Sequence, residues 1–137
     1  MYQKILVPVD DSRASLAALH EACGLCKRLG STLHVLHVLD INTLGRTGGT
    51  GEKAVKDVEN VVKEFDITCE TEIKENAGEK VADIICRSAK ECGANLIVMG
   101  THGFTGVMHL LMGSVAEGVL RQAEIPVMLL RRGKKNA

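Results

Sequence analysis

Residues 96–103 read Leu-Ile-Val-Met-Gly-Thr-His-Gly. Four consecutive apolar residues that stop at a glycine predict a short strand, Leu96–Met99, buried on both faces as strands of parallel sheets are. A second apolar run, Ile5–Val9, lies near the start of the chain and stops at Asp10. After a polar or glycine-rich segment, a helical pattern follows each run. The two stretches together predict an α/β domain.

The rest of the chain continues this alternation of strands and helices. Further strands are expected at Leu33–Leu39, Ile67–Ile73 and Val127–Leu130. Helices are expected to end at about Leu29, Phe65, Cys92 and Ala123. The order β-α-β-α-β-α-β-α-β predicts a three-layer α/β/α domain in which helices cover both faces of a parallel sheet. Because apolar and polar residues alternate over 67–73, we expect that strand at an edge of the sheet.

The length of 137 residues suits a single domain, 1–137. Residues 40–51 contain four glycines and three threonines, and we expect a flexible loop there before a helix over 52–65. Residues 132–137 should form a polar tail. Asp11 or Ser12 is expected to cap the first helix. Asn76–Glu79 resembles a capping box that would start the third.

The overall charge is zero, because seventeen basic residues balance seventeen acidic ones. A neutral chain has no general field that attracts nucleic acid or an anionic membrane, so any anion site must be local. Aromatic residues are scarce, with no tryptophan, one tyrosine and two phenylalanines, which argues against a base-stacking surface. No apolar run approaches the roughly 20 residues of a membrane helix. We expect a cytoplasmic protein with five reduced cysteines and no nucleic-acid or membrane partner.

The expected ligand site lies at the carboxyl ends of the strands, where the strand order of an open parallel sheet reverses. The tips Pro8–Asp10 and Met99–Gly103 should meet there. Gly100 and Gly103 allow close approach of a ligand to the backbone, and Gly113 with Ser114 stands at a helix start that favours phosphate. No lysine or arginine occurs between Gly100 and Ser114. These features predict a neutral cradle that binds phosphate through backbone dipoles.

The same residues carry a family resemblance. Val7–Asp10, Leu36–Val38, Ile125–Val127 and above all Gly100-x2-Gly103-x9-Gly113-Ser114 resemble the universal stress protein family, in the same order along the whole chain. The resemblance implies a five-stranded parallel sheet of order 3-2-1-4-5. It also implies a homodimer through the last strand, Val127–Leu130, and adenine-nucleotide binding in the branch that keeps the glycine spacing.

By this resemblance, Asp10 would lie near the adenine or ribose, and the backbone of Val38 would contact the adenine. The full set of implied nucleotide-binding residues is Pro8, Val9, Asp10, Val38, Met99, Gly100, Thr101, His102, Gly103, Phe104, Thr105, Gly106, Gly113, Ser114, Val115 and Ala116. The ligand would be ATP, or AMP or cyclic AMP, and Mg²⁺ or Mn²⁺ could be carried on its phosphates. No protein ligand for a metal and no catalytic residue is predicted. Without a cation in the loop, any ATP hydrolysis should be slow or dependent on a partner.

The implied function is that of a dimeric sensor or regulator in a stress response, with an unknown protein partner. Two alternatives remain. One is an interaction module of the same fold whose loop binds no nucleotide. The other is a phosphorelay receiver, suggested by Asp10-Asp11, although its phosphate-accepting aspartate is missing where the third strand ends at Ile73-Lys74-Glu75.

Several further residues have both a chemical and a structural interpretation. Cys23 and Cys26 form a C-x-x-C pair, but they lie late in a helix on its apolar face, which favours buried structural thiols over a redox or zinc site. His34 and His37 should lie on opposite faces of one strand and so cannot easily share a metal. His102 either donates to a phosphate or only packs in the loop. Gly118 stands inside a helix, where glycine costs ~1 kcal/mol relative to alanine.

Overall fold

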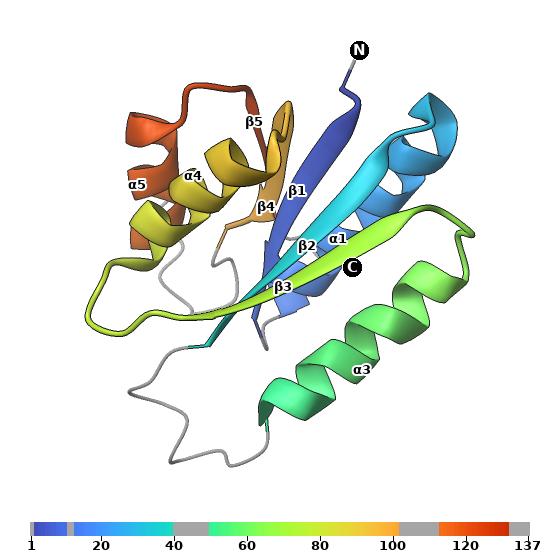
Figure 1. The fold of residues 1–137 in the computed structure, drawn as a ribbon, viewed down its shortest axis with the longest axis horizontal. Helices are drawn as coiled ribbons and strands as arrows, with labels where there is room; N and C mark the ends of the chain where they lie inside the picture. Colours follow the sequence, from blue (N-terminus) through green and yellow to red (C-terminus); the bar gives the residue numbers. More distant parts are fainter. Residues whose placement is uncertain (1, 11–12, 40–49, 102–112, 132–137) are drawn as a thin grey trace.

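The computed structural model describes residues 2–10, 13–39, 50–101 and 113–131. Its five strands form one parallel sheet in the order β3-β2-β1-β4-β5, which confirms the predicted topology. Figure 1 shows α4 and α5 on one face of this sheet and α1 and α3 on the other. The three layers therefore follow from the strand–helix alternation of the sequence.

The elements have the following bounds. The strands are β1 (Lys4–Val9), β2 (Thr32–Leu39), β3 (Cys69–Glu75), β4 (Leu96–Gly100) and β5 (Val127–Leu130). The helices are α1 (Arg13–Leu29), α3 (Thr50–Lys63), α4 (Val81–Cys92) and α5 (Ser114–Gln122).

The two faces of the sheet carry separate apolar cores. Ile5 and Val7 of β1 face α1 and α3, whereas Leu6 between them faces α4 and α5. The same division holds in β4, where Val98 and Ile97 belong to opposite cores. All five side chains are fully buried. Burial on both faces explains why these strands read as uninterrupted apolar runs.

The strand β3 lies at one edge of the sheet, as its alternating pattern predicted. Its side chains are only half-buried or exposed, and Ile73 is 54% exposed. Two helices end at a glycine in the left-handed region. Gly30 follows α1 with a φ of 71°, and Gly93 follows α4 with a φ of 78°.

Several predicted boundaries were wrong. The strand expected over 67–73 is β3, Cys69–Glu75, and the helix expected to end at Phe65 ends at Lys63. Asn76–Glu79 is a turn, closed by the Glu79 N–H donating to the Asn76 carbonyl at 2.7 Å, and α4 starts after Lys80 without a side-chain cap. The Glu79 carboxylate pairs with Arg87 at 2.8 Å, so it does not serve as the acid of a capping box. The helix α3 begins at Thr50, inside the expected 40–51 loop. Residues 40–49, Asp11, Ser12 and 132–137 lie outside the described residues.

The helices α4 and α5 pack closely because Gly118 has no side chain. A Cβ atom at Gly118 would lie 2.7 Å from the Cβ atom of Ala82 on α4. Atoms at that distance overlap, so the glycine is required by the helix–helix contact. This requirement accounts for a residue that is otherwise unfavourable inside a helix.

We therefore expect Gly118→Ala to destabilise the protein. Overpacking costs ~1–3 kcal/mol, which exceeds the gain in helix propensity of ~1 kcal/mol. The matched control is Gly24→Ala in α1, where a Cβ atom meets nothing within 4 Å. Urea denaturation should show a loss for the first variant and a gain for the control. Equal gains for both variants would show that the two helices do not need the glycine.

The two histidines of β2 lie on opposite faces, as predicted. His34 bonds Glu70 and Glu72 of β3 through its two ring nitrogens, at 2.9 and 2.8 Å. His37 is 1% exposed, and neither ring nitrogen has a hydrogen-bond partner within the described part of the chain. Burial lowers the pKa of His37 below 6.5, and the charge of Glu59 on α3 opposes this shift. The folded protein therefore holds this imidazole neutral.

His37 should make the protein less stable in mild acid. The unfolded chain takes up this proton near pH 6.5, before the folded protein does, so stability falls as the pH drops below 6.5. In His37→Leu, urea denaturation between pH 7.5 and 5 should show a smaller loss than in wild type. Replacing the exposed His20 by glutamine is the control and should retain the wild-type dependence. Identical pH profiles for wild type and His37→Leu would refute this role.

Candidate functional site

A cavity of about 360 Å³ lies at the carboxyl ends of β1 and β4, beside the first turn of α5. The strand order reverses here, because β2 pairs with β1 on one side and β4 pairs with it on the other. A crevice at such a point is where open α/β sheets bind ligands. The lining residues are Pro8, Val9, Asp10, Ala14, Ser15, Val38, Val81, Ile85, Met99, Gly100, Thr101, Gly113, Ser114, Val115 and Ala116.

Every predicted site residue that the structure describes lines this cavity. The tips of β1 and β4 meet as expected, and Gly113–Ala116 closes the cavity from α5. The predicted residues His102, Gly103, Phe104, Thr105 and Gly106 lie outside the described residues. Nucleotide binding by the lining residues is a prediction from the sequence.

Four lining residues were missed by the sequence. Ala14 and Ser15 come from the first turn of α1, and Val81 and Ile85 come from α4. Val81 and Ile85 lie on the apolar face of α4, and the helical pattern of the sequence cannot separate a cavity wall from a core contact. The signal for Ser15 was only its place after Asp10 at a helix start.

Ser15, in the first turn of α1, is hydrogen-bonded to Asp10, the residue after β1. The Asp10 N–H donates to the Ser15 hydroxyl at 3.2 Å, and that hydroxyl donates to the Asp10 carbonyl at 3.0 Å. Ser15 is 7% exposed. The turn that carries Asp10 is therefore held by a reciprocal pair of hydrogen bonds.

The start of α1 also packs directly on the end of β4. A Cβ atom at Gly100 would lie 2.5 Å from the Ala14 carbonyl oxygen and 2.8 Å from its carbon. Backbone atoms cannot move aside as a flexible side chain can. Gly100 is therefore required by helix packing, whereas the sequence had suggested only the approach of a ligand.

The first turn of α5 offers backbone donors that are not used by the bonds of the helix itself. Its first helical bond runs from the Glu117 N–H to the Gly113 carbonyl, at 3.0 Å. The N–H groups of Ser114, Val115 and Ala116 therefore have no partner within the helix. Gly113, rather than Ser114, is the N-cap residue, and no side chain caps the helix. Its φ of −75° suits any residue, so the glycine matters here for space and not for backbone conformation.

The described lining residues carry a single charged side chain, the exposed Asp10 carboxylate. An anion in this cavity would be held by backbone N–H groups and by the positive end of the α5 dipole. A carboxylate repels phosphate and accepts hydrogen bonds. The cavity therefore combines an anion-binding end, an acceptor on the β1 tip and apolar walls.

The cysteines provide no competing site. All five are free. Burial raises the pKa of Cys23 to about 12 and that of Cys26 to about 11, so both thiols stay protonated, as expected for structural cysteines. Within the described ranges, no group of three or more histidine, cysteine or acidic side chains could hold a metal ion.

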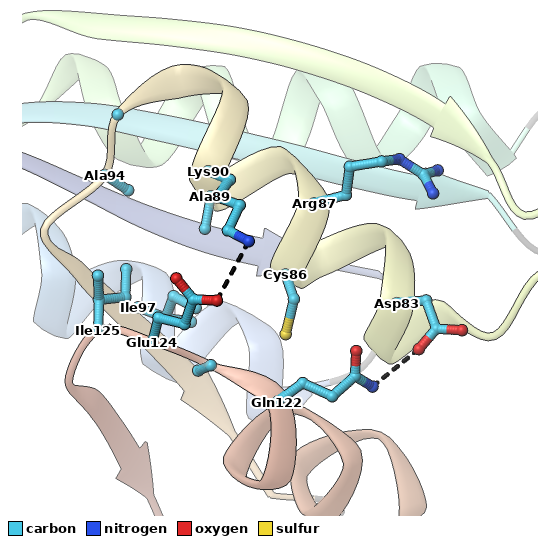
Figure 2. A pocket seen from close by; sticks show the side chains of 12 residues that line it. Asp83, Cys86, Arg87, Ala89, Lys90, Ala94, Ile97, Gln122, Glu124 and Ile125 are labelled. Carbon is cyan, nitrogen blue, oxygen red and sulfur yellow. Dashed lines mark hydrogen bonds and ion pairs between the residues drawn. The ribbon is translucent and has the colours of Figure 1, made fainter.

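A second cavity, of about 550 Å³, lies between α4 and the end of α5 (Figure 2). Although it is larger, the charged and amide side chains that line it already have partners, Arg87 through Glu79 outside the cavity. Lys90 bonds Glu124 at 3.1 Å, and the Gln122 amide donates to Asp83 at 2.7 Å. These bridges leave little for a ligand to satisfy, so the smaller cavity is the better candidate site.

None of the helices within the described ranges is long and apolar enough to cross a membrane.

The sequence model of the universal stress protein family matches residues 1–131. The chain belongs to this family. The receiver alternative is wrong, because receiver domains have the order 2-1-3-4-5 and place their third strand beside the first. Here β3 is separated from β1 by β2.

Known proteins similar to this chain agree with this assignment. The universal stress protein MJ0531 of Methanocaldococcus jannaschii is 32% identical, over 98% of this chain and 85% of the relative. The solved structure of MJ0577, another universal stress protein of that organism, has a TM-score of 0.81 at 25% identity, over 98% of this chain and 99% of the other. A universal stress protein of Archaeoglobus fulgidus, solved in complex with dAMP, has a TM-score of 0.72 at 24% identity, over 95% and 98%.

Proposed function

We propose that this universal stress protein binds an adenine nucleotide in the cavity between β1, β4 and α5. The ligand is ATP, or AMP or cyclic AMP, and the protein acts as a dimeric sensor or regulator in the cytoplasm. The single observation that carries the proposal is the convergence of the two strand tips and the open α5 N-terminus on one cavity. Residues 1–137 would act as one domain.

The three parts of the cavity correspond to the three parts of a nucleotide. The N–H groups at Ser114–Ala116 suit a phosphate. An apolar wall against which a base can pack is formed by Val38, Val81 and Ile85. The Asp10 carboxylate suits the hydroxyl or amine donors of the nucleoside. The volume of about 360 Å³ falls within the range of ~300–1,000 Å³ usual for small-molecule sites.

The Archaeoglobus fulgidus relative supports an adenine nucleotide as the ligand, because that protein was solved with dAMP. The five free thiols suit a reducing compartment such as the cytoplasm.

Binding rather than catalysis is the proposed activity. Fast phosphoryl transfer needs cationic charge on the transferring group and a positioned nucleophile. The described lining residues include no lysine, arginine or histidine. A Mg²⁺ or Mn²⁺ ion would therefore be carried on the phosphates of the ligand, and hydrolysis would be slow.

Gly113→Val should abolish nucleotide binding while the fold survives. The valine side chain would stand at the N-cap, where a phosphate must approach Ser114–Ala116, and the φ of −75° accepts it without strain. Gly24→Val is the matched control, since α1 has open space there and Gly24 lies outside the cavity. Calorimetric titration with ATP and AMP should show binding for wild type and the control, and at least about tenfold weaker binding for Gly113→Val.

Absence of binding to wild type at millimolar ATP and AMP would reject the proposal and favour an interaction module of the same fold. Equal affinity of wild type and Gly113→Val would show that the nucleotide binds elsewhere.

The dimer is proposed to form through β5. This strand pairs with β4 on one side and lies at the edge of the sheet on the other. Its four apolar residues, Val127–Leu130, are all only half-buried. An apolar edge of this kind is hidden when it pairs with a second chain. Light scattering should give the mass of a dimer, and a monomer at high concentration would contradict this interface.

A further inference from the structure

Ser15 of α1 holds the backbone of Asp10 through two hydrogen bonds. The hydroxyl of Ser15 accepts a hydrogen bond from the Asp10 N–H and donates one to the Asp10 carbonyl, at 3.2 and 3.0 Å. A hydroxyl can do both at once, because it has one donor and two lone pairs. Both polar groups of the Asp10 backbone are therefore tied to a single buried side chain.

The position of Ser15 is itself fixed by the packing of its neighbour. Ala14, next to Ser15, packs against Gly100 so closely that no side chain fits between them. On the other side, Val9 pairs with His37 in the sheet. Asp10 thus lies between the central strand β1 and the start of α1, which packs on the end of β4.

The chemistry of Asp10 differs from that of the rest of the cavity. It is the only acidic residue among the described lining residues, and it is exposed at the β1 tip. Its carboxylate repels phosphate and can only accept hydrogen bonds. In a nucleotide, the partners that suit it are the ribose hydroxyls or the adenine amine.

We propose that Ser15 is a positioning residue for nucleoside recognition, which it achieves by fixing the Asp10 backbone so that the carboxylate meets the donors of the nucleoside. This inference rests on the proposed nucleotide-binding function. An acceptor held in its bound position loses less entropy when the ligand arrives, so the hydroxyl of Ser15 contributes to affinity through Asp10. Ser15 and Asp10 then act as one unit.

A double-mutant cycle with AMP tests this coupling. Calorimetric titration of Ser15→Ala and Asp10→Asn should each show about three- to tenfold weaker binding. The double variant should bind no more weakly than Asp10→Asn alone, because a carboxylate that is absent cannot be positioned. Ser15→Thr, which keeps the hydroxyl, should retain more affinity than Ser15→Ala.

Ser31→Ala is the matched control for a purely structural effect. Ser31 is also a buried serine. It lies just before β2, outside the cavity, and its hydroxyl donates to the carbonyl of Tyr2, which precedes β1. This variant should lose stability in thermal denaturation without losing AMP affinity. Thermal denaturation of Ser15→Ala should show a cooperative transition, which establishes that the variant folds.

The outcomes separate the two proposals. If wild type binds AMP but the effects of Ser15→Ala and Asp10→Asn add, or if Ser15→Ala binds like wild type, the positioning role is wrong and the nucleotide site stands. If Ser15→Ala does not fold, the comparison of wild type with Ser15→Thr and Asp10→Asn decides, and equal affinity of all three overturns the role. If wild type binds no AMP, the proposed function fails and this inference fails with it.

Discussion

The burial of β1 on both faces is the constraint on which the rest of the structure depends. Ile5, Leu6 and Val7 are fully buried, and they point alternately to opposite faces of the sheet. Helices must therefore cover both faces, so successive crossovers place β2 and β4 on either side of β1. The reversal of strand order beside β1 opens a crevice at the carboxyl end, and the candidate site lies there.

Close packing at two glycines then sets the shape of this crevice. The start of α1 rests on Gly100 at the end of β4, and α5 rests on Ala82 of α4 through Gly118. The N–H of Thr101 donates to the Leu130 carbonyl at 3.1 Å, which continues the pairing of β4 with β5 beyond Gly100. Two helices thereby bring their first turns to the same cavity, and Gly100 and Gly118 act as structural spacers.

The sequence predicted much of the fold and the place of the cavity that forms the candidate site. Short apolar runs such as Ile5–Val9 and Leu96–Met99, bounded by turn residues, indicate doubly buried strands, and the rule that ligands bind at the strand ends of open parallel sheets indicated where the cavity would lie. It could not predict contacts that depend on how closely two elements approach. The hydrogen bonds of Ser15, the packing of Gly118 and the cavity walls at Val81 and Ile85 are of this kind. The turn at Asn76–Glu79 was misjudged because Glu79 pairs with Arg87, eight residues further along the chain and outside the local pattern.

The central claim is that the cavity between β1, β4 and α5 holds an adenine nucleotide. Native mass spectrometry of the full chain after incubation with ATP and AMP tests it most directly. The claim predicts a bound species whose added mass equals one adenine nucleotide per chain, lost in Gly113→Val and retained in Gly24→Val. No added mass in the wild type, or the same added mass in all three proteins, would contradict it.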